Sequence, residues 1–130
     1  MGWTLINQRR YEEAETAFRQ AIALDPEIAE FHSSLGEVLE IQEKYGEAEI
    51  AYRQAISLDP NYVPDYRALG WTLISQDKYE SAEEAFQQAI GIDPDNADLH
   101  SSLGFALKRQ EKYEEAEDAY RQAIALYPNY

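Results

Sequence analysis

The chain has 130 residues, of which 45% are hydrophobic and none is cysteine, so it can bury a core without disulfides or thiolate metal sites. Its 25 acidic residues outnumber 11 basic ones, and the resulting net charge of −14 argues against nucleic acid as a partner, because phosphate binding depends on Lys and Arg. No apolar run approaches the roughly 18 residues of a membrane span and no secretory leader follows Met1, so we expect no membrane insertion and favour the cytoplasm.

A period of 34 residues organises the whole chain. Glycine, tyrosine and alanine each recur with this spacing, and so does proline, at Pro26, Pro60, Pro94 and Pro128. The first and third copies share the letters GWTLI and the second and fourth share HSSLG, so a pair of repeats is used twice. We predict one array made of a partial first repeat, 1–28, and three complete repeats, 29–62, 63–96 and 97–130, with no capping helix after the last.

Each repeat is predicted to hold two helices. Apolar residues recur every three or four positions, charged pairs such as Glu43-Lys44 separate two stripes, and a proline closes the second stripe. In chain order the predicted helices are 2–8, 11–24, 29–42, 45–58, 63–76, 79–92, 97–110 and 113–126. The chain would open inside a helix, so we expect either a piece of a longer array or open ends that stack head to tail on other copies.

The residues at fixed places in the repeat are similar to those of the tetratricopeptide repeat. The third copy carries Tyr66, Leu69, Gly70, Leu73, Ala82, Phe86 and Pro94. The second and fourth carry the same kinds of residue in the same order, except for histidine at the first place, where the family pattern has tryptophan. The resemblance covers essentially the whole chain. It implies an all-α fold, a right-handed superhelical solenoid of antiparallel helix pairs with a concave inner face.

Catalytic motifs are not supported. His32 and His100 each precede a serine, but neighbours one position apart point to different sides of a helix, so we expect each histidine to pack between helices. The glycines do not cluster as in phosphate-binding loops, and the Glu-Glu runs lie on polar faces without a histidine at helical spacing. We therefore expect no enzymatic activity, no cofactor and no metal.

In the family that the chain resembles, peptide ligands usually lie against the first helix of each repeat. The resemblance implies a peptide-binding concave face made of Asn7, Glu30, Ser33, Glu37, Glu40, Arg67, Trp71, Ile74, Ser101, Phe105, Lys108 and Arg109. Trp3, Trp71 and Phe105 occupy equivalent places, so they are either exposed anchors of that face or packed between helices. The hypothesis is a ligand with an apolar centre, a basic stretch for the second repeat and an acidic end for the fourth.

The expected function is that of a protein–protein interaction scaffold that binds an unidentified protein or peptide segment. Two alternatives remain open at this point. One is a regulatory or substrate-recruiting segment of a larger enzyme, such as a glycosyltransferase, and the other is a structural assembly unit that self-associates head to tail through its open ends.

Overall fold

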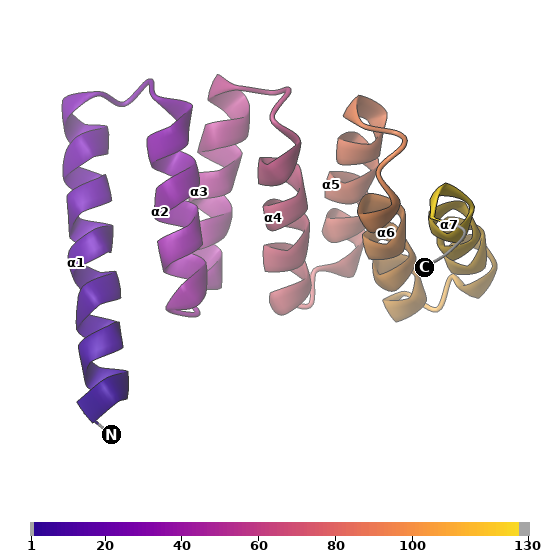
Figure 1. Ribbon diagram of the computed structural model, residues 1–130, viewed down its shortest axis with the longest axis horizontal. Helices are drawn as coiled ribbons and strands as arrows, with labels where there is room; N and C mark the ends of the chain where they lie inside the picture. The colour runs from indigo at the N-terminus through magenta and orange to yellow at the C-terminus, as the bar shows by residue number, and fades with distance from the viewer. Residues whose placement is uncertain (1, 128–130) are drawn as a thin grey trace. The chain divides into compact units, whose positions relative to one another are not determined.

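The computed structural model describes the backbone of residues 2–127 and the side chains of residues 7–127. The described residues form seven α-helices and no strand (Figure 1). The helices are α1 (Gly2–Leu24), α2 (Ala29–Ile41), α3 (Tyr45–Leu58), α4 (Val63–Ser75), α5 (Tyr79–Ile92), α6 (Ala97–Arg109) and α7 (Tyr113–Leu126). The predicted all-α helical repeat is therefore confirmed, and six helices end within one residue of their predicted bounds.

Contacts divide the chain into an N-terminal half, Met1–Asp65, and a C-terminal half, Tyr66–Tyr130. In the N-terminal half, α2 packs against both α1 and α3. In the C-terminal half, α6 packs in the same way against α5 and α7. Within the described residues, none of the helices has the length and apolar character that a membrane span requires.

The turn inside each hairpin has the same backbone hydrogen bonds. After α2, the Lys44 N–H donates to the Leu39 carbonyl and the Glu43 N–H donates to the Glu40 carbonyl, both at 2.9 Å. This pair of bonds is a Schellman motif, and it requires a left-handed residue, here Glu43 with φ of 62°. Asp77 and Glu111 take the same conformation after α4 and α6, so the charged pairs of the sequence do end these helices.

The predicted break between helices 2–8 and 11–24 is wrong, because α1 runs through it without interruption (Figure 1). Arg9 stands one period before Glu43, and its Nε lies 3.4 Å from Glu13 Oε1, one helical turn further on. Such a pair supports a continuous helix. A seven-residue first helix would also gain too little packing to offset the roughly 1–2 kcal/mol that a left-handed arginine costs.

Each complete hairpin is held together by a glycine that faces an aromatic ring. A Cβ placed on Gly36 would meet the Tyr52 ring at 2.7 Å, and one on Gly70 would meet the Phe86 ring at 2.3 Å. Tyr52 and Phe86 are fully buried. The missing side chain therefore lets the two helices of a hairpin approach closely, and the ring fills the space beside the glycine.

Candidate functional site

The N-terminal half carries four of the predicted ligand-binding residues on one helix. We call Glu30, Ser33, Glu37 and Glu40 the α2 strip. Glu30 and Glu37 are exposed, whereas Ser33 and Glu40 are half-buried. Ser33 Oγ donates to Asp65 Oδ1 at 2.6 Å, and Tyr52 Oη donates to Glu40 Oε2 at 2.8 Å. The first helix of this hairpin therefore presents two exposed carboxylates, Glu30 and Glu37, and a third, Glu40, that is held by a hydrogen bond from α3.

Asp65 is a buried acid that was not among the predicted site residues. Burial raises the pKa of its carboxyl group, the hydrogen bond from Ser33 opposes this rise, and the nearby charges of Asp59 and Glu37 add to it. Its Oδ2 atom is buried and accepts no hydrogen bond in the structure. The sequence could have indicated it, because Asp65 stands at a place where the neighbouring repeats have apolar residues, Phe31 and Leu99.

Tyr52 shares this negative environment. Burial raises the pKa of its hydroxyl well above the ordinary range, and the acceptor Glu40 and the charge of Glu37 act in the same direction. The Tyr52 hydroxyl therefore stays protonated and remains a donor to Glu40. Together these groups make the surface around α2 electronegative, which favours a cationic side chain over an anionic one.

The C-terminal half carries the aromatic part of the predicted face. The C-terminal strip consists of Arg67, Trp71 and Ile74 on α4 and Ser101, Phe105, Lys108 and Arg109 on α6. The Trp71 ring lies 5.4 Å from the Phe105 ring, and it meets the Phe86 ring edge to face at 5.6 Å. Trp71 and Phe105 are half-buried, so they both pack between helices and keep part of their surface open.

The indole N–H of Trp71 is buried and has no acceptor in the structure. A buried indole N–H normally finds a hydrogen-bond partner, and leaving one unmet costs about 1–3 kcal/mol. Trp71 therefore has an unused donor at the centre of the C-terminal strip.

The charged residues of the C-terminal strip differ in how they are engaged. Arg67 forms an ion pair with Asp98 across α4 and α6. Arg109 donates to Tyr79 Oη at 2.9 Å and its guanidinium lies 5.0 Å from the centre of the Tyr79 ring. Lys108 is exposed. Two cations thus lie near the carboxyl end of α6, and one of them is held by an aromatic ring.

Two predicted positions, Trp3 and Asn7, fall outside these two strips. The side chain of Trp3 lies outside the residues whose side chains the structure describes. Asn7 is half-buried, but it belongs to the continuous helix α1 and not to a separate first helix, so its predicted place on a hairpin is wrong.

The histidines have structural partners. His32 is buried and its Nε2 lies 2.9 Å from the Pro26 carbonyl oxygen, while the hydroxyl of Ser33 is bonded to Asp65. His100 repeats the arrangement, with its Nε2 2.8 Å from the Pro94 carbonyl oxygen. Each histidine thus fastens the loop after one helix to the helix that follows it. Within the described part of the chain, no group of three or more histidine and acidic side chains could hold a metal ion.

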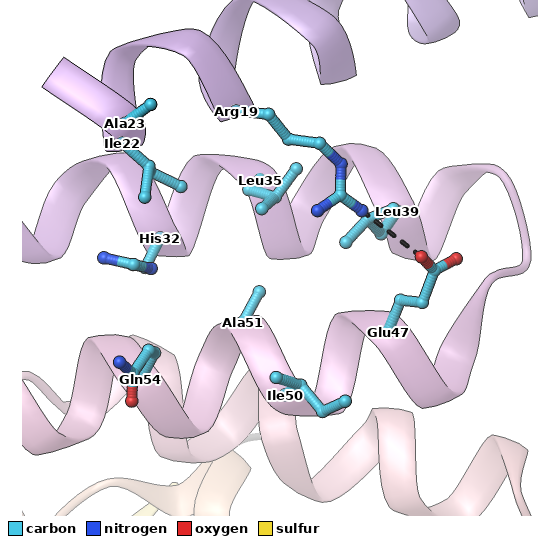
Figure 2. A pocket seen from close by; sticks show the side chains of 10 residues that line it. All are labelled: Arg19, Ile22, Ala23, His32, Leu35, Leu39, Glu47, Ile50, Ala51 and Gln54. Carbon is cyan, nitrogen blue, oxygen red and sulfur yellow. Dashed lines mark hydrogen bonds and ion pairs between the residues drawn. The ribbon is translucent and has the colours of Figure 1, made fainter. Parts of the chain in front are cut away.

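A pocket that the sequence did not predict lies between α1 and α3 over α2 (Figure 2). It encloses about 410 Å³, and its lining residues are Arg19, Ile22, Ala23, His32, Leu35, Leu39, Glu47, Ile50, Ala51 and Gln54. Figure 2 shows the ion pair that crosses one end, with Arg19 Nη2 3.3 Å from Glu47 Oε1. Ile50 is an apolar residue that is 69% exposed in this pocket. The other repeats have polar residues at the equivalent place, Thr16, Glu84 and Asp118, so the isoleucine was the sequence signal that could have indicated the pocket.

Comparisons with known proteins agree with this architecture. Solved structures of MamA are similar: a crystal structure of MamA protein is 25% identical with a TM-score of 0.86, covering 89% of this chain and 63% of that chain. Another crystal structure of MamA is 24% identical with a TM-score of 0.88, covering 98% and 74%. MamA 41-end from Desulfovibrio magneticus RS-1 is 26% identical with a TM-score of 0.85, covering 98% and 72%.

A search of curated protein sequences gives no match. The repeat fold and its likeness to these structures support a protein–protein interaction scaffold in general terms. The family model described as tetratricopeptide repeat matches residues 1–63 and 67–130, so the chain belongs to the tetratricopeptide repeat family.

Proposed function

We propose that this tetratricopeptide array binds an extended segment of a partner protein through the first helices of its hairpins. The α2 strip and the C-terminal strip are the two contact surfaces, each within its own half of the chain. The observation that carries the proposal is the Trp71–Phe105 pair, which is half-buried and partly open.

An apolar ligand residue fits the aromatic pair. A side chain placed against Trp71 and Phe105 would bury their remaining open surface. This gain arises only in the complex. It therefore favours binding over the free state.

The charges on the two strips differ in sign. Glu30 and Glu37 are exposed on α2, and the buried Asp65 beside Ser33 adds to the negative field. Lys108 and Arg109 are exposed near the end of α6. We infer a ligand with Lys or Arg for the α2 strip, an apolar centre for the aromatic pair and an acidic residue or carboxylate for α6.

We infer that the chain acts by binding and not by catalysis. The hydroxyl of Ser33 donates to Asp65 and the His32 ring is committed to the Pro26 carbonyl, so no base lies ready to activate a serine nucleophile. The same commitment of His100 to Pro94 supports this inference for the second His-Ser pair.

Fluorescence titration tests the proposal. In a Trp3→Phe background, Trp71 is the remaining tryptophan, and its emission should shift with saturation when a peptide with basic, apolar and acidic parts is added. Glu37→Lys should weaken binding of that peptide by about tenfold, a change of roughly 1.4 kcal/mol.

Glu84→Lys, an equal charge reversal at an exposed place on the second helix α5, is the matched control and should leave the affinity unchanged. A peptide of the same composition in scrambled order should bind weakly. Equal affinity for the ordered and scrambled peptides would contradict the proposed order of charges.

A further inference from the structure

A second candidate binding site is the pocket that α1 and α3 form over α2 (Figure 2). All of its lining residues belong to the N-terminal half of the chain. From α2 it takes His32, Leu35 and Leu39, which the helical period places on the side of α2 opposite to the α2 strip. The pocket is therefore a surface separate from the one in the proposed function.

The middle of the pocket is apolar. Leu35 and Leu39 are buried and line it from α2, while Ile22 and Ile50 line it from α1 and α3. Ile22 is half-buried, but Ile50 leaves most of its side chain in water. A ligand that fills the pocket and also covers this isoleucine gains stability, because apolar surface is removed from water.

One end of the pocket carries a paired charge. The Arg19 guanidinium crosses this end to Glu47, with Nη2 3.3 Å from Oε1 (Figure 2). The equivalent place two periods later lacks this balance, because Gln87 replaces Arg19 and Asp118 replaces Ile50. In a chain with a net charge of −14, the N-terminal pocket thus favours an uncharged ligand, since a charged group would lose water there without gaining a free partner.

The opposite end carries two side chains with unused hydrogen-bonding groups. Figure 2 shows His32 and Gln54 at this end, away from the Arg19–Glu47 pair. A carbonyl oxygen can only accept, so the 2.9 Å contact with Pro26 places a proton on His32 Nε2 and leaves Nδ1 of the neutral ring as an acceptor. Within residues 7–127, neither Nδ1 nor the Gln54 amide forms a hydrogen bond.

A tyrosine side chain matches both the apolar middle and the polar end. Its ring is apolar, and its hydroxyl can donate to His32 Nδ1 and accept from the Gln54 amide. Phenylalanine has no such group, and tryptophan can only donate. A tyrosine that projects from a protein surface also brings neighbouring atoms that cover Ile50. A second copy of this chain is a poor source of that tyrosine, because each copy carries a net charge of −14 and the two would repel each other.

We propose that the pocket between α1 and α3 binds a tyrosine side chain on the surface of a partner protein. The ring lies between Ile22 and Ile50 over Leu35, and the hydroxyl lies at the end that His32 and Gln54 line. Binding here leaves the α2 strip uncovered, so the chain can hold both ligands at once.

Two probes that differ by one hydroxyl group test this site, N-acetyl-tyrosinamide and N-acetyl-phenylalaninamide. In heteronuclear NMR of the isotope-labelled chain, N-acetyl-tyrosinamide should move the backbone amide signals of Leu35, Ile50 and Ala51 in a saturable way, with the millimolar dissociation constant expected of so small a ligand. N-acetyl-phenylalaninamide should bind about threefold more weakly, because it lacks the hydroxyl. Equal affinity for the two probes, or no saturable change at these residues, would overturn the proposal.

Three variants locate the contacts. Ile50→Asp places at the rim the residue type that Asp118 has at the equivalent place, and it should weaken binding of N-acetyl-tyrosinamide by about fivefold or more. Ile41→Asp, the same change at an exposed isoleucine outside the pocket, is the matched control and should leave the affinity unchanged. Gln54→Leu should reduce the preference for the tyrosine probe over the phenylalanine probe, which a change in packing alone would not do.

All three substituted residues are exposed, so circular dichroism should give the same helix content for every variant. An unchanged preference in Gln54→Leu, or an equal loss of affinity in Ile50→Asp and Ile41→Asp, would overturn the proposal.

Two measurements separate the partner protein from other occupants. Free p-cresol, the tyrosine side chain without a backbone, should bind more weakly than N-acetyl-tyrosinamide, because it leaves Ile50 uncovered; tighter binding of p-cresol would identify a free phenol as the occupant and overturn the proposal. In light scattering, the parent chain and Ile50→Asp should have the same mass at each concentration. A larger mass for the parent chain would identify a tyrosine of a second copy as the occupant and would also overturn the proposal.

Discussion

Replacing Gly70 with alanine is the most direct test of how the hairpins are packed. The added Cβ would lie 2.3 Å from Phe86 Cε1 and 2.6 Å from Cζ, whereas carbon atoms in contact prefer about 3.5 Å or more. The Phe86 ring would have to withdraw by about 1.2 Å, the difference between these distances. It has little room to do so, because it is fully buried and the Trp71 ring packs against it.

The expected cost follows from two opposing terms. Forcing an extra carbon into a tight core costs about 1–3 kcal/mol, and replacing glycine by alanine inside a helix returns about 0.5–1 kcal/mol. The net free energy of unfolding should therefore fall, by up to about 2.5 kcal/mol. Urea unfolding followed by circular dichroism measures this change as a lower midpoint.

Two other glycines provide matched controls. Gly104→Ala places its Cβ 2.9 Å from the Tyr120 ring, but that ring is half-buried and can move outward, so the loss should be smaller. Gly91 has nothing within 4 Å of its added Cβ, so Gly91→Ala should raise stability by about 0.5–1 kcal/mol. If Gly70→Ala proved as stable as Gly91→Ala, or cost less than Gly104→Ala, the packing argument would be refuted.

Three further predictions concern buried polar groups. Burial alone would raise the pKa of Glu15, but hydrogen bonds from groups including Lys44 outweigh this effect and bring the pKa below 4.5. Stability should therefore fall as the pH drops through this lowered pKa, and Glu15→Gln should flatten that loss in acid unfolding curves. The pKa of Asp65 is raised by burial, so its contribution is lost as the pH rises through the raised value, and Asp65→Asn should remove this loss in the same assay. Tyr52→Phe deletes the 2.8 Å bond to Glu40 and should lower the free energy of unfolding by about 0.5–1.5 kcal/mol in urea, whereas an unchanged value would contradict that bond's role.

Much of the fold could be predicted because every repeat obeys the same local rules. Lys44 and its equivalents mark the end of each turn, and Gly36 and its equivalents mark the close approach within each hairpin. These features recur every 34 residues, so the helix bounds found in one repeat predict those of the other repeats. The break near Arg9 could not be judged in this way, because a turn there depends on packing against a first helix and not on local propensity.

The candidate site was predictable only in part. The helical register alone indicates that Glu37 and Lys108 lie on an exposed face, and they do. The contact of Ser33 with Asp65 joins residues on different helices, so it depends on how those helices pack. The pocket beside Ile50 depends in the same way on the spacing between α1 and α3, which a repeat pattern does not specify.

The left-handed acids in the hairpin turns make backbone strain a property of each complete repeat. Glu43, Asp77 and Glu111 have φ values of 62°, 61° and 64°, and each such residue costs about 1 kcal/mol or more relative to glycine. The three turns are separate in sequence, so their costs should add. Strain in such an array therefore grows in proportion to the number of hairpins, and adding hairpins does not dilute it. Glycine at these turns would raise stability by the same increment at each position, about 0.5–1 kcal/mol after the entropy of glycine is subtracted.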